Sequence, residues 1–141
     1  MYAKLFLVFL SLFLVACNDK NDTELQDCSM TACTLNFVII TVSVKDTSDN
    51  VVVLGGYEII EEVTGEDISV DFNNEEYQYF KEQGIYPVLS DAYRTRYQNS
   101  TATLTFKGYV ANEEVINEAY EVGADCCHIS LISGNTEIVL E

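Results

Sequence analysis

The chain has 141 residues, of which 23 are acidic and 7 are basic, so its formal net charge at pH 7 is −16. Binding of nucleic acid needs lysine and arginine side chains that neutralise phosphates, and this charge balance argues against it. The same excess of negative charge disfavours adsorption of the whole surface to an anionic membrane. Its simplest consequences are solubility and repulsion between neighbouring copies.

The N-terminus predicts export and a lipid anchor. Lys4 precedes an apolar run from Leu5 to Ala16. These twelve residues span about 18 Å as a helix, short of the roughly 30 Å hydrocarbon core, so a secretory signal fits better than a membrane span. The run ends in LVAC, residues 14–17, which resembles the lipobox of bacterial lipoproteins, where the cysteine is acylated and becomes the first mature residue. The alternative is ordinary cleavage after Ala16, which leaves Cys17 as a lone thiol.

This interpretation divides the chain into three parts. Residues 1–16 are the lipoprotein signal peptide, residues 17–27 are the acylated Cys17 with a flexible polar tether, and residues 28–141 form one β-sandwich domain. We expect the protein in the cell envelope, held in the outer membrane by its lipid, on the surface-exposed or the periplasmic face. That compartment is oxidising, so its cysteines are expected to pair.

The domain consists largely of predicted strands separated by turn residues. The first, 34–44, is rich in β-branched and aromatic residues. Asp and Asn residues at 46–50 predict a turn, and Gly134-Asn135 is expected to close a hairpin between the last two strands. The other expected strands are 51–54, 57–63, 68–72, 85–90, 102–110, 115–122, 127–132 and 136–140. Turn signals at intervals of about eight to twelve residues are typical of a sandwich or barrel.

Two segments have no conformation assigned from the sequence. Residues 73–84 combine helix start and stop residues with aromatics that also suit an extended chain, and residues 91–100 fit a loop or one helical turn. The oxygen-rich stretches 46–50 and 71–76 lack the spaced acidic pattern and central glycine of an EF-hand loop, so they give calcium binding little support.

Four cysteines besides Cys17 are disulfide candidates: Cys28, Cys33, Cys126 and Cys127. A bond between the adjacent Cys126 and Cys127 would form a small strained ring. Each is therefore expected to pair with Cys28 or Cys33, in either of two connectivities. Closing a loop of about 95 to 100 residues with one bridge stabilises a fold by at most about 4 to 5 kcal/mol in the chain-entropy model. Strand alternation directs the two adjacent thiols to opposite faces, which disfavours a shared zinc ion.

His128, the only histidine of the chain, lies two residues from Cys126 and suggests a nucleophile–base pair or a pH switch. Catalysis would require a free thiolate and a third group that orients the histidine, and no such group is identifiable in the sequence. Motifs of serine hydrolases, zinc proteases and phosphate-binding loops are missing. We therefore expect a histidine at the sandwich surface or edge, no catalytic residue, no cofactor and no metal.

Two stretches resemble a known group of proteins. Residues 37–60 resemble the opening hairpin of carboxypeptidase-regulatory-like domains. Residues 122–140 resemble the closing hairpin of small secreted lipoproteins of Bacteroidota type, which have an immunoglobulin-like or transthyretin-like sandwich. Asp19 and Asp22 look like the tether signal that sends some of these lipoproteins to the cell surface. The resemblance covers about a third of the mature chain and implies an all-β domain of about seven to eight strands that is accessory and non-catalytic.

Two classes of function remain. In the first, the protein is a binding or accessory module for an extracellular or periplasmic protein or glycan partner. Tyrosine suits interfaces because it joins an apolar ring to a polar tip. The candidate binding surface is therefore Tyr77, Tyr79, Tyr86, Tyr93 and Tyr97. In the second, it is a structural envelope component without a discrete ligand. A Cys/His metal-binding or redox protein is a further alternative.

Overall fold

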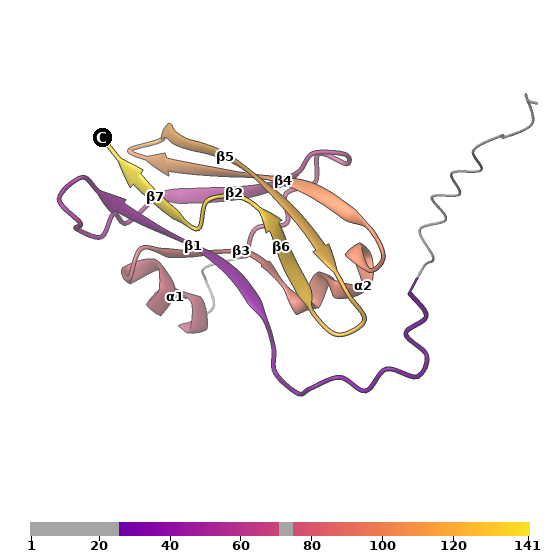
Figure 1. Ribbon diagram of the computed structural model, residues 1–141. Helices are drawn as coiled ribbons and strands as arrows, with labels where there is room; N and C mark the ends of the chain where they lie inside the picture. Colours follow the sequence, from indigo (N-terminus) through magenta and orange to yellow (C-terminus); the bar gives the residue numbers. More distant parts are fainter. Residues whose placement is uncertain (1–25, 71–74) are drawn as a thin grey trace, which may run out of the picture.

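The computed structural model describes residues 26–70 and 75–141. The expected signal peptide, Cys17 and most of the tether lie outside these residues. The described chain forms an all-β sandwich of two sheets, one ordered β3-β1-β7 and the other β2-β4-β5-β6 (Figure 1). The strands are β1 (Ile39–Asp46), β2 (Gly56–Glu61), β3 (Ile85–Ser90), β4 (Thr101–Val110), β5 (Glu113–Ala124), β6 (Ile129–Ser133) and β7 (Glu137–Leu140). The helices are α1 (Glu75–Glu82), the 3₁₀ turn η1 (Asp91–Tyr93) and α2 (Arg94–Tyr97).

The core lies between the two sheets and follows from strand alternation. In β1 the inward residues Ile40, Val42 and Val44 are buried, whereas the residues between them are partly exposed. The opposing sheet contributes apolar and aromatic side chains, among them Ile59, Leu104, Phe106, Tyr120 and Val122. Removal of this apolar surface from water is the main stabilising contribution to such a fold.

Several predicted strands are shorter than expected. The strand predicted at 34–44 begins at Ile39, because β1 pairs with β3 from Ser90 onward and the chain turns into η1 after that residue, so residues 34–38 have no partner strand. Residues 68–70 are not a strand either. The Asp67 carboxylate accepts the amide of Ser69 and bends the chain there, leaving one isolated bridge to Ile60. Residues 71–72 lie outside the described chain.

The hairpin predicted at Gly134-Asn135 is wrong, because β6 and β7 belong to different sheets. Gly134 has φ +135°, and a Cβ there would lie 2.4 Å from the ring of Tyr120. The Tyr120 hydroxyl donates to the carbonyl of Asn135 at 2.6 Å. The chain therefore crosses between the sheets, and β7 pairs in parallel with β1. The turn predicted at 46–50 forms, with an antiparallel bridge between Lys45 and Val51, but the chain then leaves the first sheet, and β2 lies in the other sheet from β1.

Residues 91–97 form helical turns that bring hydrogen-bonding side chains to a buried carboxylate. Glu61 takes an inward position in β2 and is only 6% exposed. Arg96 forms an ion pair with it, and the hydroxyls of Tyr97 and Thr64 donate to it. The hydrogen bond from Thr64 lowers the pKa of the Glu61 carboxyl, against the effect of burial, and Arg96 and Tyr97 lower it further. A buried charge without such partners would be strongly destabilising, which explains why α2 packs here.

We expect Tyr86→Phe to lower the free energy of unfolding by about 1–3 kcal/mol, because it leaves a buried amide unsatisfied. The Tyr86 hydroxyl accepts the amide of Leu54 at 2.6 Å, and both side chains are fully buried. Urea unfolding followed by circular dichroism measures the change. The matched control is Tyr79→Phe at a position that is 65% exposed, where the effect should stay within about 0.5 kcal/mol. An equal loss of stability in both variants would contradict the role assigned to the hydrogen bond between the Leu54 amide and the Tyr86 hydroxyl.

Candidate functional site

The four predicted cysteines form two disulfides at one end of the sandwich. Cys28 bonds Cys126 and Cys33 bonds Cys127, with sequence separations of 98 and 94. The expected pairing of an N-terminal cysteine with each member of the adjacent pair is confirmed, and the structure selects one of its two connectivities. Both bridges consume the thiols, so the Cys126–His128 nucleophile–base pair that the sequence suggested as an alternative is not formed.

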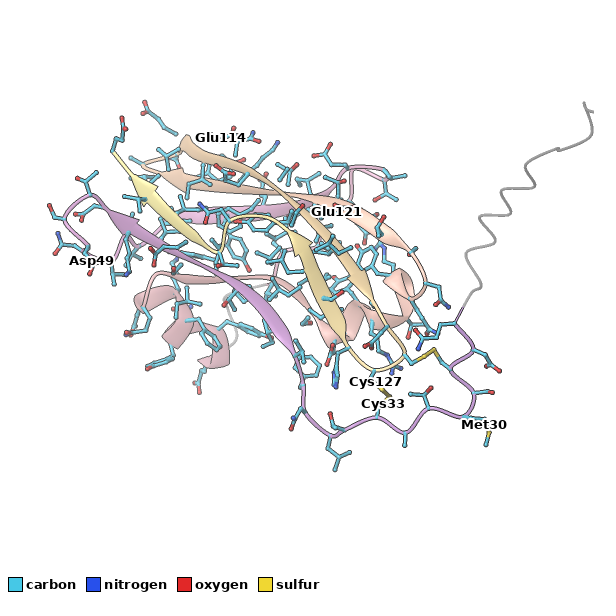
Figure 2. The ribbon with its side chains drawn as sticks, in the orientation of Figure 1. Met30, Cys33, Asp49, Glu114, Glu121 and Cys127 are labelled. Carbon is cyan, nitrogen blue, oxygen red and sulfur yellow. A yellow bond between two sulfur atoms is a disulfide. The ribbon has the colours of Figure 1, made fainter. Side chains whose placement is uncertain are left out.

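The adjacent cysteines lie in a tight turn that precedes β6. The Asp125 carboxylate accepts the amides of Cys127 and His128 at 2.7 and 2.8 Å. These hydrogen bonds lower the pKa of the Asp125 carboxyl. Arg94 of α2 donates to the carbonyl of Cys126 at 2.7 Å. The turn is thereby fixed from both sides, so the two disulfides leave it in different directions (Figure 2).

His128 contacts a group that sequence reasoning missed. Its Nδ1 lies 2.8 Å from Oδ2 of Asp91, and its Nε2 lies 3.0 Å from the hydroxyl of Thr34. An ionised carboxylate only accepts, so Nδ1 carries a proton. In the neutral imidazole, Nε2 then accepts the proton of the Thr34 hydroxyl. No sequence pattern connects the three residues, because 94 positions separate Thr34 from His128.

The order hydroxyl, imidazole, carboxylate is that of a nucleophilic triad, and it permits a proton to move between Thr34 and His128. The other hydrogen bonds of Asp91, however, indicate a structural role. Its oxygens also accept the amides of Val38 at 2.8 Å and Ile129 at 2.9 Å, where β1 and β6 begin. Burial raises the pKa of the Asp91 carboxyl, and these hydrogen bonds together with His128 overcome that effect and lower it. The cluster therefore joins three segments that are distant along the chain, which is a structural role.

Residues 26–38, which we call the arm, run outside the sandwich along this end (Figure 1). The arm forms no strand, and its attachments are made one by one. They are the hydrogen bonds between Gln26 and Asn99, the two disulfides, the contact of Thr34 with His128, and the bond from the amide of Val38 to Asp91. Side chains between these attachments project into solvent.

The five tyrosines predicted to form a binding surface do not lie together on an exposed surface. Tyr86 and Tyr97 are corrected to core residues, because they are 0% and 2% exposed. Tyr77 and Tyr93 are half-buried, and Tyr79 on α1 is exposed. The prediction failed because the same apolar ring that suits an interface also suits a core, where Tyr86 packs against Phe106 and Tyr97 bonds Glu61.

A groove of about 650 Å³ opens at the opposite end of the sandwich. Its apolar lining comes from Val52, Val110, Val115 and Leu140, and its polar lining from Asp46, Thr47 and Glu141. The groove lies where β1 ends and where the β4–β5 hairpin turns. Figure 2 shows Asp49 and Glu114, which belong to this end, far from Cys33 and Cys127.

Sequence reasoning did not identify this groove. The hairpin that forms one side turns at Ala111 and Asn112, with φ of 51° and 66°. Asn favours such a conformation, but Ala does not, so the dipeptide gives a weak turn signal. The valines at 110 and 115 resemble core residues in the sequence, although they are 37% and 41% exposed.

Among residues 26–70 and 75–141, no group of three or more His, Cys, Asp and Glu side chains is arranged to hold a metal ion. No helix in these ranges is long and apolar enough to cross a membrane. The chain matches no protein-family model, no curated protein and no solved structure.

We expect Asp91→Asn to lower the free energy of unfolding near neutral pH by about 1–3 kcal/mol, because it weakens hydrogen bonds to a buried charged group. The pKa of Asp91 is lowered in the folded protein. The stability that it contributes is therefore complete above about pH 4 and is lost as the pH falls through the folded value. Urea unfolding at a series of pH values should show the difference between variant and parent shrinking in that acidic range. Glu113→Gln, at the exposed first residue of β5, is the control, and a pH-independent difference would contradict the proposed role.

Proposed function

We propose that the protein is a non-catalytic, lipid-anchored lipoprotein of the cell envelope that presents its distal groove to a protein partner. One observation carries the proposal: the disulfides attach the arm at one end of the sandwich, and the residues that line the groove lie at the other end, where β1 and β7 end (Figure 1). β5 runs from the groove at Glu113 to the disulfide end at Ala124, a length of about 40 Å for its 12 residues. A membrane anchor at Cys17 would hold the disulfide end close and leave the groove accessible.

Two features support an anchored protein outside the cytoplasm. The LVAC sequence at 14–17 follows a signal-like apolar run directly. Two disulfides that close loops of nearly the whole domain form and persist in oxidising compartments such as the periplasm or the cell surface. Outer-membrane attachment and membership of the Bacteroidota-type lipoproteins are parts of the same proposal.

The chemistry of the groove favours a protein over a glycan. Its lining is aliphatic, from three valines and Leu140, and no aromatic side chain lines it for stacking on a sugar ring. Asp46 and Glu141 add negative charge beside this apolar surface, on a chain of net charge −16. The complementary partner is a protein segment with an apolar side chain next to lysine or arginine. Such charge complementarity increases the rate of encounter and excludes acidic partners.

The anchor is tested by labelling cells with an alkyne fatty acid. We expect the full chain to take up the label and to fractionate with membranes. Cys17→Ser should lose both properties, because it removes the acylated sulfur. Val139→Ser, at an exposed position of β7, is the control and should keep them. Label retained by Cys17→Ser would contradict lipidation at this residue.

The groove is tested by photo-crosslinking in cells that make the full chain. We expect benzoylphenylalanine at position 115 to give one discrete adduct with a second protein, whose crosslinked peptide contains lysine or arginine beside apolar residues. The same probe at position 63 is the control, since Val63 is 89% exposed but is not part of the groove. Val110→Glu should abolish the adduct at 115 by charging the apolar lining. No adduct, or equal adducts from both positions, would contradict a binding role for the groove.

A further inference from the structure

We infer that the arm is a second interaction surface, which rests on the lipid bilayer through Met30, Leu35 and Phe37. These side chains are 94%, 104% and 60% exposed, within eight consecutive residues. Exposed apolar residues occur singly on most proteins, whereas these three lie on one short segment that no strand or helix covers. The inference rests on the lipid anchor at Cys17 proposed above.

The arm cannot easily fold these side chains away from solvent. Met30 lies between the disulfides of Cys28 and Cys33, which attach the chain to the turn before β6. Leu35 and Phe37 lie between the Cys33 disulfide and the amide of Val38, which donates to Asp91. Fixed at both ends of each interval, the arm holds its apolar side chains outward. A contact made by such a preorganised segment loses little conformational entropy.

The length of chain before the arm limits where it can lie. Cys28 lies eleven positions after Cys17. A fully extended chain of that length reaches at most about 40 Å. With acyl chains on Cys17, the arm belongs to the end of the sandwich that the anchor keeps nearest to the bilayer. The residues that line the groove lie at the other end of the sandwich, the end to which Asp49 and Glu114 belong (Figure 2).

Charge distinguishes the arm from the rest of the molecule. Asp27 is the one charged residue of the arm, and residues 28–38 contain none, although the chain has 23 acidic residues. Arg94 lies beside the arm and donates to the carbonyl of Cys126. Other surfaces of so acidic a chain are repelled by anionic lipid, so the uncharged part of the arm, residues 28–38, is the surface that can approach a bilayer. Apolar side chains of such a segment enter the headgroup–acyl boundary to a depth of about 5–10 Å.

The chain contains no tryptophan, which gives a direct test. Lipidated full chain carrying Leu35→Trp is reconstituted in phosphatidylcholine vesicles, with and without brominated phosphatidylcholine. We expect a blue-shifted emission that loses roughly half its intensity to the brominated lipid, because the ring lies in the interfacial region. Val139→Trp, at a 54% exposed position near the groove end, is the control and should keep a water-like, unquenched emission.

Each other outcome overturns the inference in a recognisable way. A vesicle-bound Leu35→Trp variant whose tryptophan emission remains water-like would show an anchored protein with a free arm. A blue shift that depends on protein concentration but not on brominated lipid would show contact with a second protein copy. Full chain that does not associate with vesicles at all, while Cys17 carries no lipid by mass, would overturn the anchor and the inference together.

Discussion

Two disulfides from adjacent cysteines fix the arm to one end of the sandwich. The organisation of that end depends on them. Cys126 and Cys127 reach two points of the arm, Cys28 and Cys33. A single bridge would allow the arm to rotate about its attachment, whereas two fix its direction. In the chain-entropy account the first bridge, which closes a loop of about 100 residues, is worth about 4 to 5 kcal/mol, a large part of the stability of one domain. The second bridge then closes only a short loop and contributes less. The hydrogen bonds of His128 and Asp91 then add to a geometry that the covalent bonds have already set.

The sandwich separates two ends with different properties. The disulfide end carries the cross-linked arm, whose residues 28–38 are uncharged, and the other end offers an apolar groove with acidic residues beside it. The strands between them are rigid, and β5 spans the whole distance. This arrangement suits a protein that is held at one end and binds at the other. The Thr34–His128–Asp91 cluster has the order of a triad, but its hydrogen bonds to the starts of β1 and β6 account for its position.

Much of the fold could be predicted from the sequence. The predictions that failed share one cause, which is that they depend on contacts between segments distant along the chain. Strands 85–90, 102–110 and 115–122 were predicted within two residues, because local alternation and turn residues report directly on a half-buried strand. The hairpin at Gly134 was wrong, because a glycine before asparagine suits a tight turn and equally suits a close approach to Tyr120. The helical turns at 91–97 could not be assigned from the sequence, because Glu61, to which Arg96 is ion-paired, lies thirty-five positions away.

The candidate sites show the same contrast between local features, which the sequence reveals, and long-range contacts, which it does not. The sequence by itself determined that the chain is an all-β domain with paired cysteines, and it indicated a lipobox, because composition, alternation and motifs are local properties. Only the tertiary structure decided which cysteine bonds which, that Asp91 orients His128, that Tyr86 and Tyr97 are core, and that valines at 110 and 115 line a groove. Those features depend on contacts between segments that are distant along the chain. Their partners are chosen by packing and by satisfaction of buried polar groups, which no short stretch of sequence encodes.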